Sequence, residues 1–271
     1  MFFLLIIFAS TIQGLFSWSP LSSMSTKVPV AKRVKANNIE ISEMGCGTWS
    51  WGNRLLWDYD PNQDEMIYES YKYIRSAGIS IFDTADSYGT LDLNGRAEIL
   101  LGEFERRYIK ERGEVLEEKK DWLDIFSKEN PVQPQQVATK FAPYPWRVTP
   151  NQMVQAARSS LNRLGQEKLS IAQLHWSTAN YQPLQEKALW QGIGDVYDEG
   201  LCDAVGVSNY GPLQLQKISD YMKSREVPLA TAQIQYSLMT YKDSKDMNEC
   251  CNENGCRLIS YSPLCLGVSA L

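Results

Sequence analysis

The sequence predicts one α/β domain built as a (β/α)8 barrel, the TIM-barrel arrangement. Short apolar runs of strand length alternate with helical segments from about residue 44 onward, which is typical of a parallel sheet covered by helices. Three successive runs each end in an ionisable residue: Asp83, Lys140 and His175, the only histidine in the sequence. Because the carboxyl ends of barrel strands meet at one rim, we expect these three side chains to share a site.

Seven strands can be assigned from the apolar runs. They cover residues 44–48, 79–83, 136–140, 170–175, 204–208, 231–236 and 257–261. A closed barrel of this class has eight strands, and ten residues follow the seventh run. We therefore expect a barrel that lacks its eighth strand and final helices.

The intervening helices are predicted from apolar spacing and end signals. Met66, Ile67, Tyr71 and Ile74 follow helical spacing, and Gly78 closes that helix. A threonine cap followed by Pro150 opens a later one. The charged stretch 111–134 is expected to be a surface insertion. The expected helices span about 63–77, 96–110, 150–165, 185–199, 213–224 and 244–254.

Charge and cysteine content exclude some classes of function. The net charge is −5, but residues 1–38 hold four basic residues and no acid, so the remainder carries −9. An acidic body offers no electrostatic footprint for nucleic acid. The six cysteines show no C-x-x-C spacing, and one histidine leaves few ligands for zinc, so no metal site is expected.

Residues 1–38 are predicted to be a removable, disordered targeting segment, and residues 39–271 the oxidoreductase domain. The apolar run 2–9 has the length of a signal-peptide core, and residues 17–38 are Ser-rich and basic. This combination indicates a plastid reached through the secretory route. The secretory pathway, the cytoplasm and an untargeted tail remain alternatives, and no membrane association is expected of the mature protein.

Asp83, Lys140 and His175, together with Tyr88 just after the second strand, form a proton-donating set. A phenol has an ordinary pKa of about 10. An ammonium at ~4 Å in an effective dielectric of ~20 would lower it by ~3 units, and Asp83 would hold Lys140 in place. His175 would hydrogen-bond a substrate carbonyl. The set suits carbonyl reduction by hydride from a nicotinamide. The alternative, a hydrolase using Asp83 and Asp86 as a carboxylate pair, leaves Lys140 and His175 without roles.

These motifs resemble the aldo-keto reductase family. The resemblance lies in 82–89 (FDTADSYG), 98–102 (EILLG), the lysine of ATKF, the histidine of QLHW and 206–209 (GVSN). It implies a catalytic tetrad of Asp83, Tyr88, Lys140 and His175. It also implies NADPH contacts, with Ser208, Asn209 and Gln233 on the carboxamide, Tyr261 on the ring, and the pyrophosphate near the carboxyl end. The full set of implied cofactor residues is Thr48, Ser208, Asn209, Gln233, Tyr261, Ser262 and Leu264.

Further segments resemble a plant, plastid-located branch of the family: 47–57, 83–95, 141–147, 173–185 and 208–221. That resemblance implies NADPH-dependent reduction of an aldehyde, pyridoxal to pyridoxine, as in vitamin B6 salvage. Trp49, Trp51, Trp146 and Trp176 could stack on a flat pyridine aldehyde.

One feature departs from the family pattern. The family's eighth strand and the helix that binds the 2′-phosphate have no counterpart after residue 261. The alternative function is therefore a cofactor-binding or regulatory protein with little turnover. The oligomeric state is left open.

Overall fold

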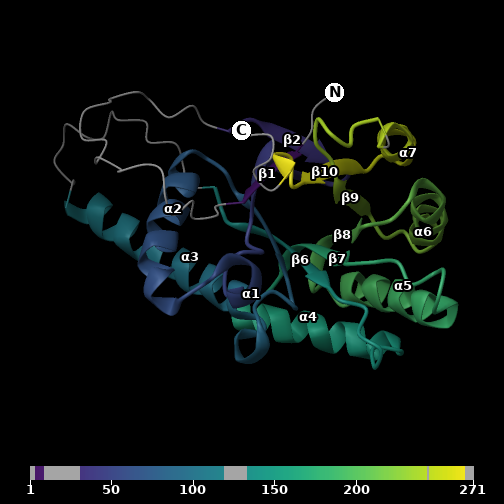
Figure 1. Cartoon of the computed structure of the whole chain (residues 1–271), viewed down its shortest axis with the longest axis horizontal. Coiled ribbons are helices and arrows are strands. Elements are labelled where there is room, and N and C mark those ends of the chain that lie inside the picture. The colour runs from purple at the N-terminus through teal and green to yellow at the C-terminus, as the bar shows by residue number, and fades with distance from the viewer. Residues whose placement is uncertain (1–3, 9–30, 119–132, 243, 266–271) are drawn as a thin grey trace.

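The computed structural model describes residues 4–8, 31–118, 133–242 and 244–265. The described residues form a closed parallel barrel with helices packed around it (Figure 1). Each strand pairs in parallel with its neighbours. Around the barrel the order is β1 (Leu4–Phe8), β10 (Arg257–Tyr261), β9 (Leu229–Gln235), β8 (Cys202–Ser208), β7 (Leu169–Leu174), β6 (Gln136–Phe141), β5 (Ile81–Ala85) and β4 (Met44–Gly47).

The (β/α)8 barrel and its seven predicted strands are confirmed as β4 to β10. The expectation of an empty eighth position is corrected, because β1 lies between β10 and β4. Leu5 is paired with Met44 on one side and with Ser260 on the other. The apolar run that resembles a signal core also has the length and composition of a buried barrel strand. Its backbone supplies partners for two edges that would otherwise be open.

The predicted domain boundary at residue 39 falls within a hairpin of the described structure. β2 (Arg33–Ala36) and β3 (Ile39–Ser42) form an antiparallel hairpin. The hairpin tip donates hydrogen bonds from Asn37 to the carbonyl of Leu229 at 3.3 Å and from Asn38 to the carbonyl of Asp203 at 3.0 Å. Both acceptors lie at the amino ends of barrel strands, so the hairpin covers that mouth. Residues 9–30 of the predicted targeting segment lie outside the described residues.

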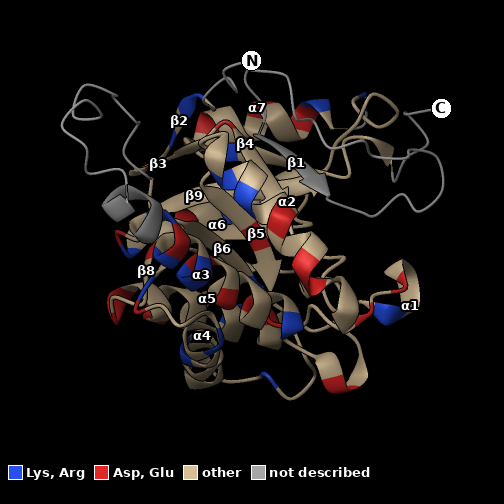
Figure 2. Ribbon diagram, turned by 90° about the vertical axis from the view of Figure 1, so that its left-hand side faces the viewer, with Lys and Arg blue, Asp and Glu red and all other residues tan. Residues whose placement is uncertain are grey.

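Helices cover the outside of the barrel, as the sequence predicts. Figure 2 shows acidic and basic residues interspersed along these helices. The long helix α3 runs well past residue 110, so the first part of the predicted insertion is helical, whereas 119–132 lie outside the described residues. Among the described residues no helix is both long and apolar enough to cross a bilayer. The helices are α1 (Arg54–Trp57), α2 (Asp64–Ser76), α3 (Arg96–Glu118), α4 (Pro150–Leu164), α5 (Pro183–Asp198), α6 (Pro212–Ser224) and α7 (Lys245–Asn254), with short 3-10 turns at Pro61–Gln63 and Leu91–Leu93.

Two apolar clusters position the site. The larger one packs the helices against the outer faces of the strands. The smaller one gathers Ile81, Ala138, Ile171 and Ile259 from four strands, against Ile41 of the hairpin. The amino-terminal mouth is thus filled by apolar side chains, and the polar residues of the strands are left for the carboxyl-terminal mouth, where barrel chemistry is found.

Candidate active site

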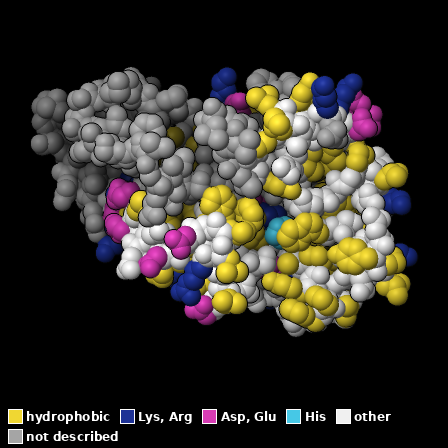
Figure 3. Space-filling model, in the orientation of Figure 1, with side chains coloured by type: hydrophobic (Ala, Val, Ile, Leu, Met, Phe, Trp, Pro, Cys, Tyr) yellow, Lys and Arg dark blue, Asp and Glu magenta, His cyan; other side chains and the backbone are white. Residues whose placement is uncertain are grey.

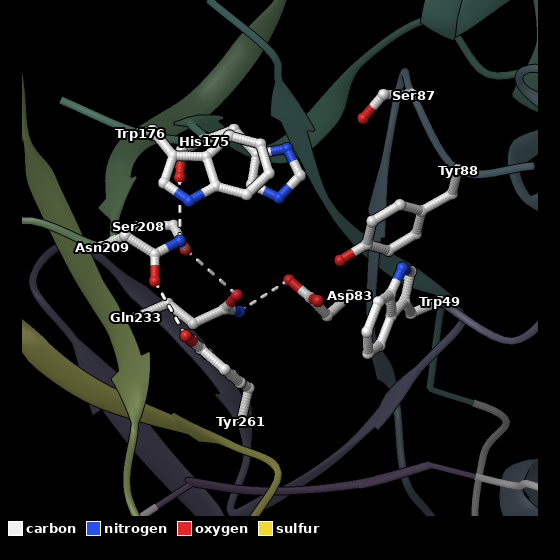
Figure 4. Close-up of a pocket in the computed structure, with 10 residues that line it drawn as sticks. All are labelled: Trp49, Asp83, Ser87, Tyr88, His175, Trp176, Ser208, Asn209, Gln233 and Tyr261. Atoms are coloured by element: carbon white, nitrogen blue, oxygen red, sulfur yellow. Dashed lines mark hydrogen bonds between the residues drawn. The ribbon is translucent and has the colours of Figure 1, made fainter. Parts of the chain in front are cut away.

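A cavity of about 330 Å³ opens at the carboxyl ends of the strands. Figure 3 views this face, with His175 among hydrophobic side chains, and Figure 4 shows the lining. The lining comes from six strands or from the loops that follow them, so the topology of the barrel brings these residues together. It consists of Trp49, Asp83, Ser87, Tyr88, His175, Trp176, Ser208, Asn209, Gln233 and Tyr261.

Asp83, which lines the cavity, forms a buried ion pair with Lys140, which lies outside the lining. Lys140 Nζ lies 2.5 Å from Asp83 Oδ2, and both side chains are almost wholly buried. The other carboxylate oxygen accepts from Gln233 Nε2 at 2.7 Å and from Gln173 Nε2 at 3.3 Å. Every side of the carboxylate is therefore held by a donor, as a buried charge requires.

Gln173 was not predicted to take part in the site. It lies on β7, two residues before His175, and its Oε1 accepts from Thr231 at 3.3 Å. A polar residue inside an otherwise apolar strand was the available signal, because such a residue needs a partner within the barrel.

Tyr88 follows β5 on a turn that requires glycine next to it. Gly89 has φ of +122°, and a Cβ there would lie 1.8 Å from the carbonyl oxygen of Leu93. The turn directs the Tyr88 hydroxyl into the cavity toward Asp83 (Figure 4), and Lys140 Nζ lies 4.9 Å from the ring centroid.

The protonation of Tyr88 differs from the sequence-based argument. Burial, together with the negative charge of Asp83, raises the pKa of Tyr88 well above its ordinary value. The expected lowering by Lys140 was wrong, because burial outweighs it and the carboxylate of Asp83, which holds the ammonium, acts on the phenol in the same direction as burial. Tyr88 is consequently a neutral phenol at physiological pH and retains a proton to donate.

His175 stands at the end of β7 on the opposite wall. Its ring centroid is 5.9 Å from that of Tyr88, and it stacks on Trp176 at 3.7 Å. Burial, with a contribution from the charge of Lys140, lowers the pKa of His175 well below its ordinary value. The imidazole is therefore neutral and has one N–H to donate. Its buried Nδ1 has no hydrogen-bond partner within the described residues.

The loop that carries His175 and Trp176 is fixed by a buried carboxylate. Glu186 on α5 accepts from Ser177 Oγ at 2.9 Å and from Thr178 N at 2.5 Å. It also accepts from Trp190 Nε1 at 3.0 Å, and the same indole N–H lies 3.2 Å from Tyr210 Oη in the loop after β8. One acid thus ties together the two loops that form adjoining walls of the cavity.

The residues predicted to hold the nicotinamide form one connected cluster. Asn209, in the left-handed conformation with φ of 58°, donates to the carbonyl of His175 at 3.0 Å and to Ser208 Oγ at 3.1 Å. Tyr261 Oη donates to Asn209 Oδ1 at 2.9 Å. Ser208 Oγ lies 3.4 Å from Gln233 Oε1. The structure therefore brings four of the seven predicted cofactor residues into one wall.

The other three predicted cofactor residues lie off the cavity. Thr48 is fully buried, and both its N–H and its hydroxyl donate to the carbonyl of Asp83, at 2.9 and 3.2 Å. This geometry makes Thr48 a support for Asp83. Ser262 and Leu264 follow β10 beside Tyr261, outside the lining. Leu264 is half exposed, and Ser262 has φ of 46°.

Two of the four predicted substrate tryptophans line the cavity and two do not. Trp49 and Trp176 face it (Figure 4). Trp51 is fully buried and packs on Phe104 at 5.5 Å, in the core. Trp146 is 65% exposed and stacks on Tyr144 at 4.7 Å, away from the lining.

Ser87 lines the cavity although it was not predicted to do so. Its place directly before Tyr88 was the available signal. Asp86 does not reach the cavity. It pairs with the buried Arg147 at 2.9 Å and accepts from Ala142 N at 3.1 Å, so the carboxylate pair that a hydrolase would use is not assembled with Asp83.

With this geometry established, comparison with known proteins defines the family. The model of the Aldo/keto reductase family matches residues 43–269, and the chain belongs to that family. It is 50% identical over 238 residues to the chloroplastic pyridoxal reductase of Arabidopsis thaliana, covering 88% of this chain and 60% of that protein.

More distant relatives share the fold. The NADH-specific methylglyoxal reductase of Escherichia coli is 25% identical over 245 residues, covering 88% of this chain and 67% of that protein. A crystal structure of an aldo-keto reductase complexed with NADPH superposes with a TM-score of 0.63 at 24% identity, covering 86% of this chain and 62% of that one. The chain spans about 60% of the length of its Arabidopsis relative.

Proposed function

We propose that the protein is an NADPH-dependent reductase that converts an aldehyde to an alcohol, with pyridoxal as substrate and pyridoxine as product. The observation that carries the proposal is the pairing of protonation states at the cavity. A neutral Tyr88 phenol and a neutral His175 imidazole face the same space above the Asp83–Lys140 pair. This arrangement offers two hydrogen-bond donors to one carbonyl oxygen and presents no nucleophile to its carbon.

The wall opposite Tyr88 fits a nicotinamide. Ser208, Asn209 and Gln233 present hydroxyl and amide groups that match a carboxamide in both donors and acceptors. The half-buried ring of Tyr261 gives a face for stacking. We assign the pyrophosphate to the turn at Ser262 and Leu264.

The protein's own groups handle the proton. NADPH, when bound, supplies hydride to the carbonyl carbon. Tyr88 Oη gives its proton to the carbonyl oxygen, while the N–H of His175 holds that oxygen in position. As the phenol loses its proton, the ammonium of Lys140, 4.9 Å from the ring centroid, stabilises the negative charge on the ring. Asp83 keeps that ammonium in place.

The cavity walls favour a flat aromatic aldehyde. Trp49 lies beside Tyr88 and Trp176 lies against His175, so two indole faces border the position of the carbonyl (Figure 4). The 50% sequence identity to a pyridoxal reductase supports pyridoxal over other aldehydes of that shape. Ser87, at the same rim, is placed to hydrogen-bond a ring substituent of such a substrate.

We propose a plastid location on the basis of the chloroplastic relative and the basic, Ser-rich residues that follow Phe8. Cleavage anywhere in the segment 9–30 would also remove β1. The segment that directs import would then contain the strand that closes the barrel. The fold of the imported protein would therefore depend on where cleavage occurs.

The test measures loss of NADPH with pyridoxal as substrate, using the whole chain. We expect turnover by the wild type, and a decrease of ~10²–10⁴ in rate for Tyr88→Phe with little change in NADPH binding. The control is Tyr73→Phe, a tyrosine that is 65% exposed on α2, which should turn over normally. NADPH binding without turnover by the wild type would favour the regulatory alternative. Activity of Tyr88→Phe within a few-fold of wild type would refute the acid role.

A further inference from the structure

Two cysteines meet where helix α7 ends, just before the amino end of β10, and neither of them lines the active-site cavity. Gly255 has φ of 69°, its N–H donates to the carbonyl of Asn252 at 3.2 Å, and the N–H of Cys256 donates to the carbonyl of Cys251 at 3.0 Å. This pair of hydrogen bonds defines the Schellman motif, which brings the side chains at its first and last positions into contact. Those positions are Cys251 and Cys256.

The geometry of the motif suits a bond between the two sulfurs. One backbone hydrogen bond joins the two residues, so their Cα atoms lie no more than ~7 Å apart, near the range that disulfides span. Cys256 Sγ lies 3.6 Å from the carbonyl oxygen of Cys251. The interaction between the two neighbouring thiols raises the pKa of the Cys251 thiol and lowers that of the Cys256 thiol. Cys256 is therefore the better nucleophile of the two.

The neighbouring Cys250 is engaged elsewhere. Its Sγ lies 3.5 Å from the carbonyl oxygen of Pro212 on α6 and 3.6 Å from Asn254 Nδ2. It is thus a matched comparison on the same helix. Within the described residues there is no group of three or more ligands that could hold a metal ion, so the pair is a two-thiol site.

Cys256 can be reached from outside through a cavity of about 550 Å³ that shares no residue with the candidate active site. Lys35 and Arg257 contribute two cationic side chains to its lining. Cys251 lies deeper and is 1% exposed. A small anionic disulfide entering this cavity would meet positive charge and the Cys256 sulfur first.

We propose that Cys251 and Cys256 form a reversible dithiol–disulfide site that exchanges with small anionic disulfides. The Cys256 thiolate attacks the reagent, forming a mixed disulfide and releasing one thiolate. Cys251 then gives up its proton and attacks the Cys256 sulfur, which forms the internal disulfide and releases the second thiolate. Two protein thiols are oxidised and one external disulfide is reduced to two thiols. The linkage fastens the end of α7 to the start of β10.

The experiment treats the folded whole chain with glutathione disulfide, followed by alkylation, digestion and mass spectrometry. All variants carry Cys265→Ser, because Cys265 is the most exposed of the free thiols. We expect a Cys251–Cys256 link in this parent. Cys251→Ser should instead retain glutathione on Cys256, and Cys256→Ser should give neither product. The matched control, Cys250→Ser, should form the link as the parent does.

Failure of the folded parent to form the link, or its loss in Cys250→Ser, overturns the proposal. Equal behaviour of the Cys251 and Cys256 variants overturns the assigned order of attack. Phenylarsine oxide, which bridges two close thiols, gives a test that does not depend on the serine variants folding. An arsenic bridge between Cys251 and Cys256 in the parent supports the site, and its absence refutes it.

Discussion

Replacing Lys140 alone by methionine should destabilise the protein far more than replacing Lys140 and Asp83 together by uncharged residues. The two charges are 2.5 Å apart, with 1% and 7% of their side chains exposed. At an effective dielectric of ~20 their gross attraction is ~7 kcal/mol, which largely offsets several kcal/mol of desolvation for each ion. Lys140→Met alone leaves a buried carboxylate without its cation, at an expected cost of ~3–5 kcal/mol.

The double variant Asp83→Asn/Lys140→Met should lose much less, ~1–2 kcal/mol. It removes both charges, and the asparagine oxygen can still accept from Gln233 and Gln173. Urea unfolding followed by tryptophan fluorescence gives the free energy of unfolding of each variant. Both variants should lack reductase activity, so the two differ in their free energy of unfolding and not in turnover.

The matched control is Lys168→Met. Lys168 Nζ is 2.6 Å from Asp203, but the two side chains are 47% and 46% exposed. Solvent screens such a pair, so we expect a loss of ~0–1 kcal/mol. The argument from burial would fail if Lys140→Met lost as little stability as this control. It would also fail if the loss in the double variant equalled the sum of the losses in Lys140→Met and Asp83→Asn measured separately.

Three further predictions concern other parts of the molecule. The imidazole proton resonance of His175, the sole histidine, should not titrate near pH 6.5 in the folded protein. Because burial lowers the pKa of His175, the unfolded chain binds the proton at a higher pH than the folded protein does. The free energy of unfolding should therefore fall as pH drops below ~6.5, by at most ~1.4 kcal/mol per pH unit. His175→Asn should lack this part of the pH dependence, and an NMR titration of His175 with a normal midpoint would contradict the prediction. Trp51→Ala, in the core, should lower the free energy of urea unfolding by ~3–5 kcal/mol. The exposed Trp146→Ala should lower it by under ~1 kcal/mol, and equal losses would contradict the assignment of Trp51 to the core and Trp146 to the surface. Removing residues 1–30 takes away β1 and exposes the edges of β4 and β10, so light scattering should detect aggregation; a soluble monomer that melts like the whole chain would show that β1 is dispensable.

Most of the fold could be predicted because each strand is a separate apolar run. β4 to β10 lie within a residue or two of their expected positions. β1 could not be assigned in the same way, since an apolar run of this length near the amino terminus is equally typical of a signal core. Pairing with both β10 and β4 depends on residues more than thirty positions away, which local composition does not reveal.

The sequence predicts those residues of the candidate site whose position along a strand alone brings them to the rim of the barrel. Asp83 and Lys140 lie on β5 and β6, His175 directly follows β7, and parallel topology brings the three to one rim. Side-chain direction needed the structure. Trp49 and Trp51 are two residues apart on a loop, where no strand alternation applies, and one faces the cavity while the other enters the core.

The protonation of Tyr88 could not be deduced from the residue types present. A lysine beside a phenol lowers its pKa only while the ammonium acts alone, and here Asp83 Oδ2 accepts from that ammonium directly. Burial determines the protonation state of the resting phenol, the charge of Asp83 acts in the same direction, and the proton stays on oxygen. Loss of that proton creates a negative charge on a ring whose centroid lies 4.9 Å from Lys140 Nζ. The ammonium then divides its attraction between Asp83 and the phenolate, so the same pair that leaves the phenol neutral at rest stabilises the product of proton transfer.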